Sequence, residues 1–233
     1  MLYKFLSDDC SSRESRDAGL ALSAHLDRMI ALQTEGLPLV EQTIGAATFK
    51  KLNVIELGSG CGIVGISLAQ SIPDCDVLLT DLPEAREIAE RNIRCANPAM
   101  GSKVSFLELD WEKPLPATVA SKSFDLILIA DCTYNIDSGP SLVRTLRSLV
   151  LKTSKSIILL AMKVRHESEL GFFDLMQEAN FVNKPHLKLA IPGSNGESDE
   201  ILVYVFHDKD RPSYAADKAD PMLHKTLVQF WSE

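Results

Sequence analysis

A glycine-rich turn constrains the fold of this chain more than any other feature of its sequence. The segment Val54–Gly65 reads VIELGSGCGIVG, in which an apolar run ends at Gly58 and a helical pattern begins near Gly62. Glycines allow the backbone to turn tightly and a ligand to approach it, because no Cβ stands in the way. In doubly wound sheets such a turn lies at the carboxyl ends of the strands, where nucleotide-like ligands bind. The turn therefore predicts an α/β fold with a ligand site at that edge.

An acidic residue after the next apolar run narrows the chemistry of the ligand. Asp81 follows Gly58 by 23 residues and ends the run DVLLTD, a position from which a carboxylate accepts hydrogen bonds from both hydroxyls of a ribose. These features predict a nucleoside-type cofactor. A nicotinamide dinucleotide is disfavoured, because the GxGxxG pattern requires glycine where Ile63 stands. Glu56 also suits the amino group of a methionine moiety better than a pyrophosphate, whose negative charge it would repel.

Short apolar runs alternate with helical patterns along most of the chain, which is typical of a doubly wound, mostly parallel sheet. Strands are expected at 53–57, 76–80, 104–109, 125–130 and 156–161, and helices from Asp17 and at 62–71, 83–95, 138–151 and 167–179. Two further runs, 181–190 and 201–206, are separated by the turn-rich sequence PGSNG. This arrangement predicts an antiparallel hairpin at one edge and seven strands in total.

The chain of 233 residues is long enough for one large domain with a buried sheet core. We assign residues 17–207 to this domain and residues 1–16 to a flexible N-terminal lead. Residues 208–233 form a C-terminal extension that is expected to dock on the same domain through apolar side chains near its end, namely Leu223, Leu227, Phe230 and Trp231.

Composition excludes several classes of function. A formal net charge of −8 argues against nucleic-acid binding, which needs clustered Lys and Arg. The five cysteines form no CxxC pair and the five histidines form no HExxH motif, so neither a disulfide framework nor a metal site is expected. No run approaches the length of a membrane span, and no basic-then-apolar leader begins the chain. We expect a monomer that has no membrane partner. Its expected location is the cytoplasm, and the nucleus is kept as a second location.

Four segments resemble a known family of enzymes. They are ELGSGCGIVG at 56–65, Thr80–Asp81, Leu109–Trp111 and the sequence ADCTY at 130–134. Together they are similar to the seven-β-strand protein-lysine methyltransferases of methyltransferase family 16, methyltransferase-like 21 group, over about residues 17–207. The resemblance implies a Rossmann-like methyltransferase fold with S-adenosyl-L-methionine as cofactor and S-adenosyl-L-homocysteine as product. It also implies a protein substrate with an accessible lysine.

The resemblance assigns a role to each matched position. The glycine turn would hold the methionine part of the cofactor, Asp81 the ribose, and Asp110 with Trp111 the adenine. An indole also offers a purine a large flat apolar face. The full set of expected cofactor-binding residues is Glu56, Gly58, Ser59, Gly60, Asp81, Leu82, Asp110, Trp111 and Ala130.

The acid-x-x-aromatic motif after the fourth strand, Asp131–Tyr134, supplies the expected catalytic residues. Asp131 would orient the incoming amine or the cofactor, and Tyr134 would line the lysine channel. Acidic residues near the fifth strand, Glu167, Glu169 and Asp174, are candidates for a rim that recruits a basic target loop, although a solvated helix face explains them equally well.

One departure from the family pattern keeps alternatives open. Members usually carry Trp-Asp at the start of the helix before the first strand, where this chain reads RDAGL at 16–20. Either another side chain, such as Phe5 or Trp231, covers the methionine end, or cofactor affinity is reduced. A methyltransferase acting on histidine or a small amine therefore stays open, as does a non-catalytic binding module.

Overall fold

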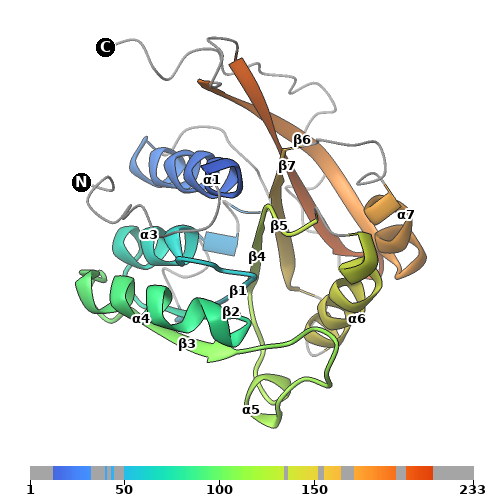
Figure 1. Cartoon of the computed structure of the whole chain (residues 1–233), viewed down its shortest axis with the longest axis horizontal. Helices are drawn as coiled ribbons and strands as arrows, with labels where there is room; N and C mark the ends of the chain where they lie inside the picture. Colours follow the sequence, from blue (N-terminus) through green and yellow to red (C-terminus); the bar gives the residue numbers. More distant parts are fainter. Residues whose placement is uncertain are drawn as a thin grey trace.

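The structure, a computed structural model, describes residues 13–32, 40, 43–44, 50–133, 136–151, 155–163, 171–192 and 198–211. At its centre lies a seven-stranded sheet with the order β3-β2-β1-β4-β5-β7-β6 (Figure 1). The strands are β1 Leu52–Leu57, β2 Cys75–Asp81, β3 Lys103–Glu108, β4 Leu126–Ala130, β5 Ile157–Met162, β6 Phe181–Pro192 and β7 Ser198–Asp208. Strands β1 to β5 are parallel, whereas β7 runs antiparallel to both β5 and β6. The predicted fold class is confirmed.

Helices cover both faces of the sheet (Figure 1). One face carries α1 Arg13–Leu32, α3 Ile63–Ser71 and α4 Arg86–Cys95, and the other carries α5 Ala117–Ala120, α6 Gly139–Val150 and α7 Gly171–Glu178. Two short 3-10 turns, η2 Pro83–Ala85 and η3 Ile136–Ser138, precede α4 and α6. Among the described residues no helix is long and apolar enough to cross a membrane.

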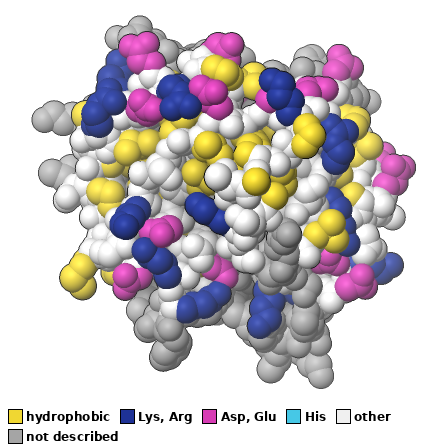
Figure 2. All heavy atoms as spheres, turned by 90° about the horizontal axis from the view of Figure 1, so that it is seen from below, with side chains coloured by type: hydrophobic (Ala, Val, Ile, Leu, Met, Phe, Trp, Pro, Cys, Tyr) yellow, Lys and Arg dark blue, Asp and Glu magenta, His cyan; other side chains and the backbone are white. Residues whose placement is uncertain are grey.

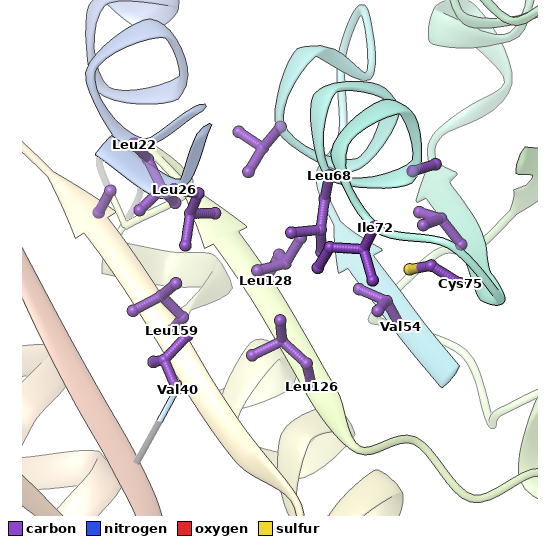
Figure 3. Packing of buried hydrophobic residues seen from close by; sticks show 14 of the residues in the cluster. Leu22, Leu26, Val40, Val54, Leu68, Ile72, Cys75, Leu126, Leu128 and Leu159 are labelled. Carbon is purple, nitrogen blue, oxygen red and sulfur yellow. The ribbon is translucent and has the colours of Figure 1, made fainter. Parts of the chain in front are cut away.

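Two apolar cores, one on each face, hold these layers together. In Figure 3, Leu22 and Leu26 of α1 and Leu68 of α3 point toward the sheet, where Leu128 and Leu159 lie. Every residue of β5 is buried, because helices cover both sides of a central parallel strand. Burying one such leucine contributes about 1.5–3 kcal/mol. The central strands therefore provide a rigid frame for residues at their ends.

Helix and strand positions follow the sequence pattern with few differences. Helix α1 begins at Arg13, inside the stretch interpreted as an N-terminal lead, and the short helix α5 had no counterpart among the expected elements. The strands of the hairpin extend further than expected, to Pro192 and from Ser198. The connector at 193–197, the first twelve residues and the end of the chain from 212 lie outside the described residues, so their assignments stay predictions.

The order of the strands reverses beside β1. This strand pairs with β2 on one side and with β4 on the other, although β4 comes much later in the chain. A crevice at the carboxyl ends of the strands is expected at such a reversal. The ends of β1, β2 and β4 therefore meet at one place, and the predicted site residues follow them.

Candidate functional site

The glycine turn joins β1 to α3, and its first two glycines face different surroundings. Gly58 has a φ of 63°, and a Cβ placed there would lie 2.4 Å from the Cys132 Sγ. Gly60 has a φ of 52°, and no atom lies within 4 Å of a Cβ built on it. The turn is thus packed against the protein at Gly58 and open at Gly60. The open side forms a cradle that any side chain at position 60 would fill.

Asp81, at the carboxyl end of β2, closes the turn from the side. Its Oδ2 accepts a hydrogen bond from the Gly60 N–H at 2.7 Å, and its Oδ1 accepts one from the Leu82 N–H at 2.7 Å. Each carboxylate oxygen has a second lone pair. Asp81 can therefore hold the turn in place and still accept hydrogen bonds from two ligand hydroxyls.

Two orphaned polar atoms lie at the same edge. The Ser59 Oγ is buried, as is the Trp111 Nε1, and neither has a hydrogen-bond partner among the described residues. Buried polar atoms without partners are uncommon, and each one calls for an explanation. Leu82, which follows Asp81 directly in the sequence, keeps 48% of its surface exposed. A ligand with polar groups and an apolar face would satisfy all three residues.

Asp110 and Trp111 follow β3 and are tied to neighbouring loops. The Leu109 N–H donates to the Asp81 carbonyl at 2.8 Å, and the Trp111 carbonyl accepts from Arg144 at 3.2 Å. Lys113 hydrogen-bonds the Asp110 carboxylate, which also accepts from the Glu112 N–H, and these bonds hold the pKa of Asp110 below its usual value. The loop therefore carries a charged carboxylate next to an indole.

Glu56 lies beneath the glycine turn and is only 2% exposed. Its Oε2 accepts a hydrogen bond from the Gly65 N–H at 2.8 Å. Burial raises the pKa of Glu56 to about 8, the Asp81 charge acts in the same direction, and the Gly65 hydrogen bond opposes both. Glu56 is therefore mostly protonated near neutral pH in the free protein.

A Glu56→Gln variant should change how stability depends on pH. The carboxyl has a pKa near 4.5 when unfolded and about 8 when folded. Its contribution to stability is therefore fully present below the lower value and is lost as pH rises through the higher one. Relative to the parent, the ligand-free variant should gain on the order of 3 kcal/mol between pH 5 and pH 9, as measured by chemical denaturation.

A matched control is Asp110→Asn, because the depressed pKa of Asp110 keeps this carboxyl charged throughout that range. The difference between this control and the parent should be the same at each pH. A difference between Glu56→Gln and the parent that did not vary with pH would contradict the prediction.

Asp131 directly follows β4 with a φ of 55°, a left-handed conformation that is uncommon outside glycine. It is 5% exposed, and its N–H donates to the Ala161 carbonyl at 2.8 Å. Residues held in such conformations cluster at functional sites, where the surrounding structure compensates for the strain. Tyr134, the other expected catalytic residue, lies outside the described residues.

Cys132 and Thr133 fix the segment after β4 against its neighbours. The Cys132 Sγ lies 3.4 Å from the Leu57 carbonyl oxygen and 3.5 Å from that of Gly58. Burial raises the pKa of the Cys132 thiol well above its usual range, and the charges of Asp81, Glu56 and Asp131 add to this effect. The carboxyl groups of these three residues therefore lie near Cys132 and the glycine turn.

The first half of α1 lies close to the start of α3 and to the end of β4. A Cβ on Gly19 would lie 3.1 Å from Ile63 Cγ2, at the start of α3, and 4.0 Å from the Ala130 Cβ. The segment RDAGL thus lies beside the glycine turn and the end of β4. Phe5 and Trp231, the proposed substitutes for the family tryptophan, lie outside the described residues.

The structure brings ten of the predicted site residues together at this edge. The roles assigned to them stay predictions. They are Glu56, Gly58, Ser59, Gly60, Asp81, Leu82, Asp110, Trp111, Ala130 and Asp131. Sequence reasoning missed Gly19 and Cys132, whose importance comes from close packing. A small residue at each position was the available signal, although it is a weak one. Among the described residues no cluster of metal-ligating side chains occurs. Asp174 of the proposed acidic rim is exposed, whereas Glu167 and Glu169 lie outside the described residues.

Comparisons with known proteins agree with this geometry. Residues 8–179 match a family described as lysine methyltransferase. A UPF0665 family protein of Schizosaccharomyces pombe is 38% identical over 136 residues, which is 55% of this chain and 41% of that protein. The protein N-lysine methyltransferase METTL21A of Mus musculus is 34% identical over 145 residues, which is 61% of this chain and 64% of that protein. The chain thus spans less than two thirds of each of these relatives.

A solved structure extends the similarity to the fold. The N-methyltransferase NodS from Bradyrhizobium japonicum, in complex with S-adenosyl-L-homocysteine, has a TM-score of 0.55 and 13% sequence identity. The alignment covers 89% of this chain and 96% of that one. At this identity the likeness concerns the fold alone.

Proposed function

The chain belongs to the lysine methyltransferase family, and on that premise we propose that it transfers a methyl group from S-adenosyl-L-methionine to a lysine side chain of a protein. One observation carries the proposal beyond family membership. The Asp81 carboxylate bridges the Gly60 and Leu82 N–H groups beside the open cradle at Gly60. A carboxylate in this position can also accept hydrogen bonds from the two vicinal hydroxyls of a nucleoside, which supports the proposal.

The residues at this edge fit the cofactor. The orphaned Ser59 Oγ and Trp111 Nε1 supply hydrogen-bonding groups, and the exposed Leu82 supplies an apolar surface. Asp81 and Asp131 make the site acidic, Glu56 adds a further negative charge only when it loses its proton, and neither Glu56 nor Asp81 forms an ion pair with another described residue. An acidic site of this kind favours a ligand that carries positive charge.

When bound, the cofactor supplies an electrophilic methyl group on a positively charged sulfur. The chain's own task is then to hold the acceptor amine in line, to exclude water and to favour the neutral amine. Holding two reacting groups in attack geometry can lower a barrier by roughly 7–11 kcal/mol, so no strong base is needed. In this proposal Asp131, which is buried at the carboxyl end of β4, accepts a hydrogen bond from the amine and so orients it.

A protein acceptor is supported by the similarity to METTL21A of Mus musculus, which is named as a protein N-lysine methyltransferase. On the face shown in Figure 2, basic and acidic side chains are interspersed without a large area of one sign. Beyond β4, Lys163 at the end of β5 forms an ion pair with Asp199 of β7 at 2.6 Å. Lys163 directly follows β5 and this pair neutralises its charge, so a cationic lysine side chain can approach the end of β5 with less repulsion from Lys163.

The test begins with cofactor binding. Titration calorimetry with S-adenosyl-L-methionine should show saturable binding by the parent chain and at least a tenfold weaker affinity for Asp81→Ala, since the variant loses both hydroxyl acceptors. Asp76→Ala is the matched control, because Asp76 lies at the opposite end of the same strand. Equal affinity in the parent and in Asp81→Ala would refute the assignment of this edge.

Methyl transfer is tested next with labelled cofactor and protein extracts, followed by mass spectrometry of the labelled residues. Label on lysine supports the proposal. Label on histidine or on a small amine would redirect it to another methyltransferase class, and tight cofactor binding without any transfer would leave a non-catalytic module.

A further inference from the structure

Glu56 is enclosed by groups that leave its carboxyl little room, and the Gly65 N–H compensates only partly for its burial. A Cβ on Gly65 would lie 2.7 Å from the Glu56 Oε2 and 2.7 Å from both Leu79 and Val77. Helix α3 therefore lies against the carboxyl, with apolar side chains of β2 beside it. A charged carboxylate in such a place is costly unless a partner compensates for its lost hydration.

The elements packed around Glu56 offer it mainly negative neighbours. Helix α3 contains no charged residue, β2 presents Asp81, and Asp131 with Cys132 follows β4. The side of the sheet that carries Glu56 also carries α1, on which Asp27 accepts hydrogen bonds from Ser67 and Ser71 of α3. The remaining titratable groups of α1 with described side chains are Asp17, His25 and Arg28. Burial lowers the pKa of His25 to about 4, and the charge of Arg28 acts in the same direction, so His25 is neutral.

We propose that Glu56 determines how the site distinguishes S-adenosyl-L-methionine from S-adenosyl-L-homocysteine: it is a neutral acid in the free protein and releases its proton when the positively charged ligand is bound. The two ligands differ by one methyl group and by the positive charge on sulfur. A cation near a carboxyl favours the carboxylate, so the proton leaves to solvent as the charged ligand binds. The inference rests on the proposed function, because it requires the same cofactor site.

The buried environment supports this exchange at physiological pH. The pKa of Glu56 near 8 means that the free protein retains the proton at pH 7. A ligand that lowers this pKa must bind more tightly as pH rises toward 8, since less work is then spent on removing the proton. The product lacks the sulfonium and should lower the pKa less. Selectivity for the methylated form should consequently increase with pH.

Calorimetry measures the proton directly and needs no enzymatic turnover. Each ligand is titrated at pH 7 into the full chain in buffers of different ionisation enthalpy, and the slope of the binding enthalpy gives the protons released. Release should approach one proton for S-adenosyl-L-methionine and be clearly smaller for S-adenosyl-L-homocysteine. Between pH 6.5 and pH 8.5 the affinity for the first should rise about twentyfold, and that for the second by less.

Glu56→Gln should abolish the proton release and flatten both pH profiles. The amide oxygen can still accept the Gly65 N–H bond, so the turn keeps its anchor. Asp76→Asn is the matched control and should retain the release, because Asp76 lies at the end of β2 opposite to Asp81 and the proposed cofactor site. Proton release in the parent and in Asp76→Asn but not in Glu56→Gln supports the inference.

Three outcomes would overturn the inference: binding by the parent without proton release, equal release with both ligands, or undiminished release in Glu56→Gln. Titrations of the parent alone decide the first two outcomes, so the test does not depend on whether Glu56→Gln folds. These outcomes leave the proposed function intact, whereas a parent that binds neither ligand refutes the proposed function and the inference together.

Discussion

Gly58→Ala is expected to lose about 3 kcal/mol of folding stability and all measurable binding of S-adenosyl-L-methionine. The first cause is the φ of 63°, which costs an alanine roughly 1–2 kcal/mol. The second is the new Cβ, which would lie 2.4 Å from the Cys132 Sγ and 3.3 Å from Trp111. Overpacking of this kind typically costs about 1–3 kcal/mol. Chemical denaturation and calorimetry measure the two losses.

Gly60→Ala separates binding from folding. Its φ of 52° carries a similar backbone cost, but its Cβ meets no atom within 4 Å. This variant should therefore fold with a loss of about 1–2 kcal/mol and still fail to bind, because the methyl group occupies the cradle. Adding Cys132→Ala to Gly58→Ala should recover part of the lost stability. Equal stability of the two single glycine variants would show that the contact with Cys132 is unimportant.

Asp131→Asn is expected to lower kcat by about a hundredfold while cofactor affinity and folding stability stay close to those of the parent. Asparagine adopts positive φ values about as readily as aspartate, so the backbone at 55° tolerates the change. The lost property is the negative charge that orients the amine. Steady-state kinetics with the lysine acceptor identified by labelling, together with denaturation curves, provide the measurement.

Asp131→Ala is the companion variant. It should lose as much activity as Asp131→Asn but also about 1–2 kcal/mol of stability, because alanine is strained at this φ. Turnover of Asp131→Asn within twofold of the parent would remove Asp131 from the mechanism. In that case Tyr134, tested as Tyr134→Phe, would become the leading candidate.

The features that could be predicted from the sequence are those whose chemistry is local. A glycine turn after an apolar strand and an acid at the end of the next strand predicted the edge of the sheet at which the candidate site residues meet. The apolar runs also located every strand to within a few residues. Helix α5 was missed because a segment of four residues, Ala117–Ala120, is too short to show a helical period.

The features that could not be predicted depend on contacts between distant residues. The Cys132 Sγ reaches the Gly58 carbonyl across 74 positions of sequence, and only the pairing of β4 with β1 brings them together. Likewise, the hydrogen bond from the Gly65 N–H to the Glu56 carboxyl was not predicted, whereas the expected place of this carboxyl beside a ligand amino group stays a prediction. No residue pattern encodes that bond, because it depends on how α3 packs against the sheet.

The strand order also has a consequence for synthesis on the ribosome. The glycine turn emerges long before β4, its neighbour in the sheet, and the fully buried β5 obtains its second partner only when β7 has been made. Pairings so distant in sequence form slowly, since a large loop must close before any contact compensates for it. The nascent chain therefore presents bare apolar strand edges for most of its elongation, and it should depend on chaperone protection until β7 completes the sheet.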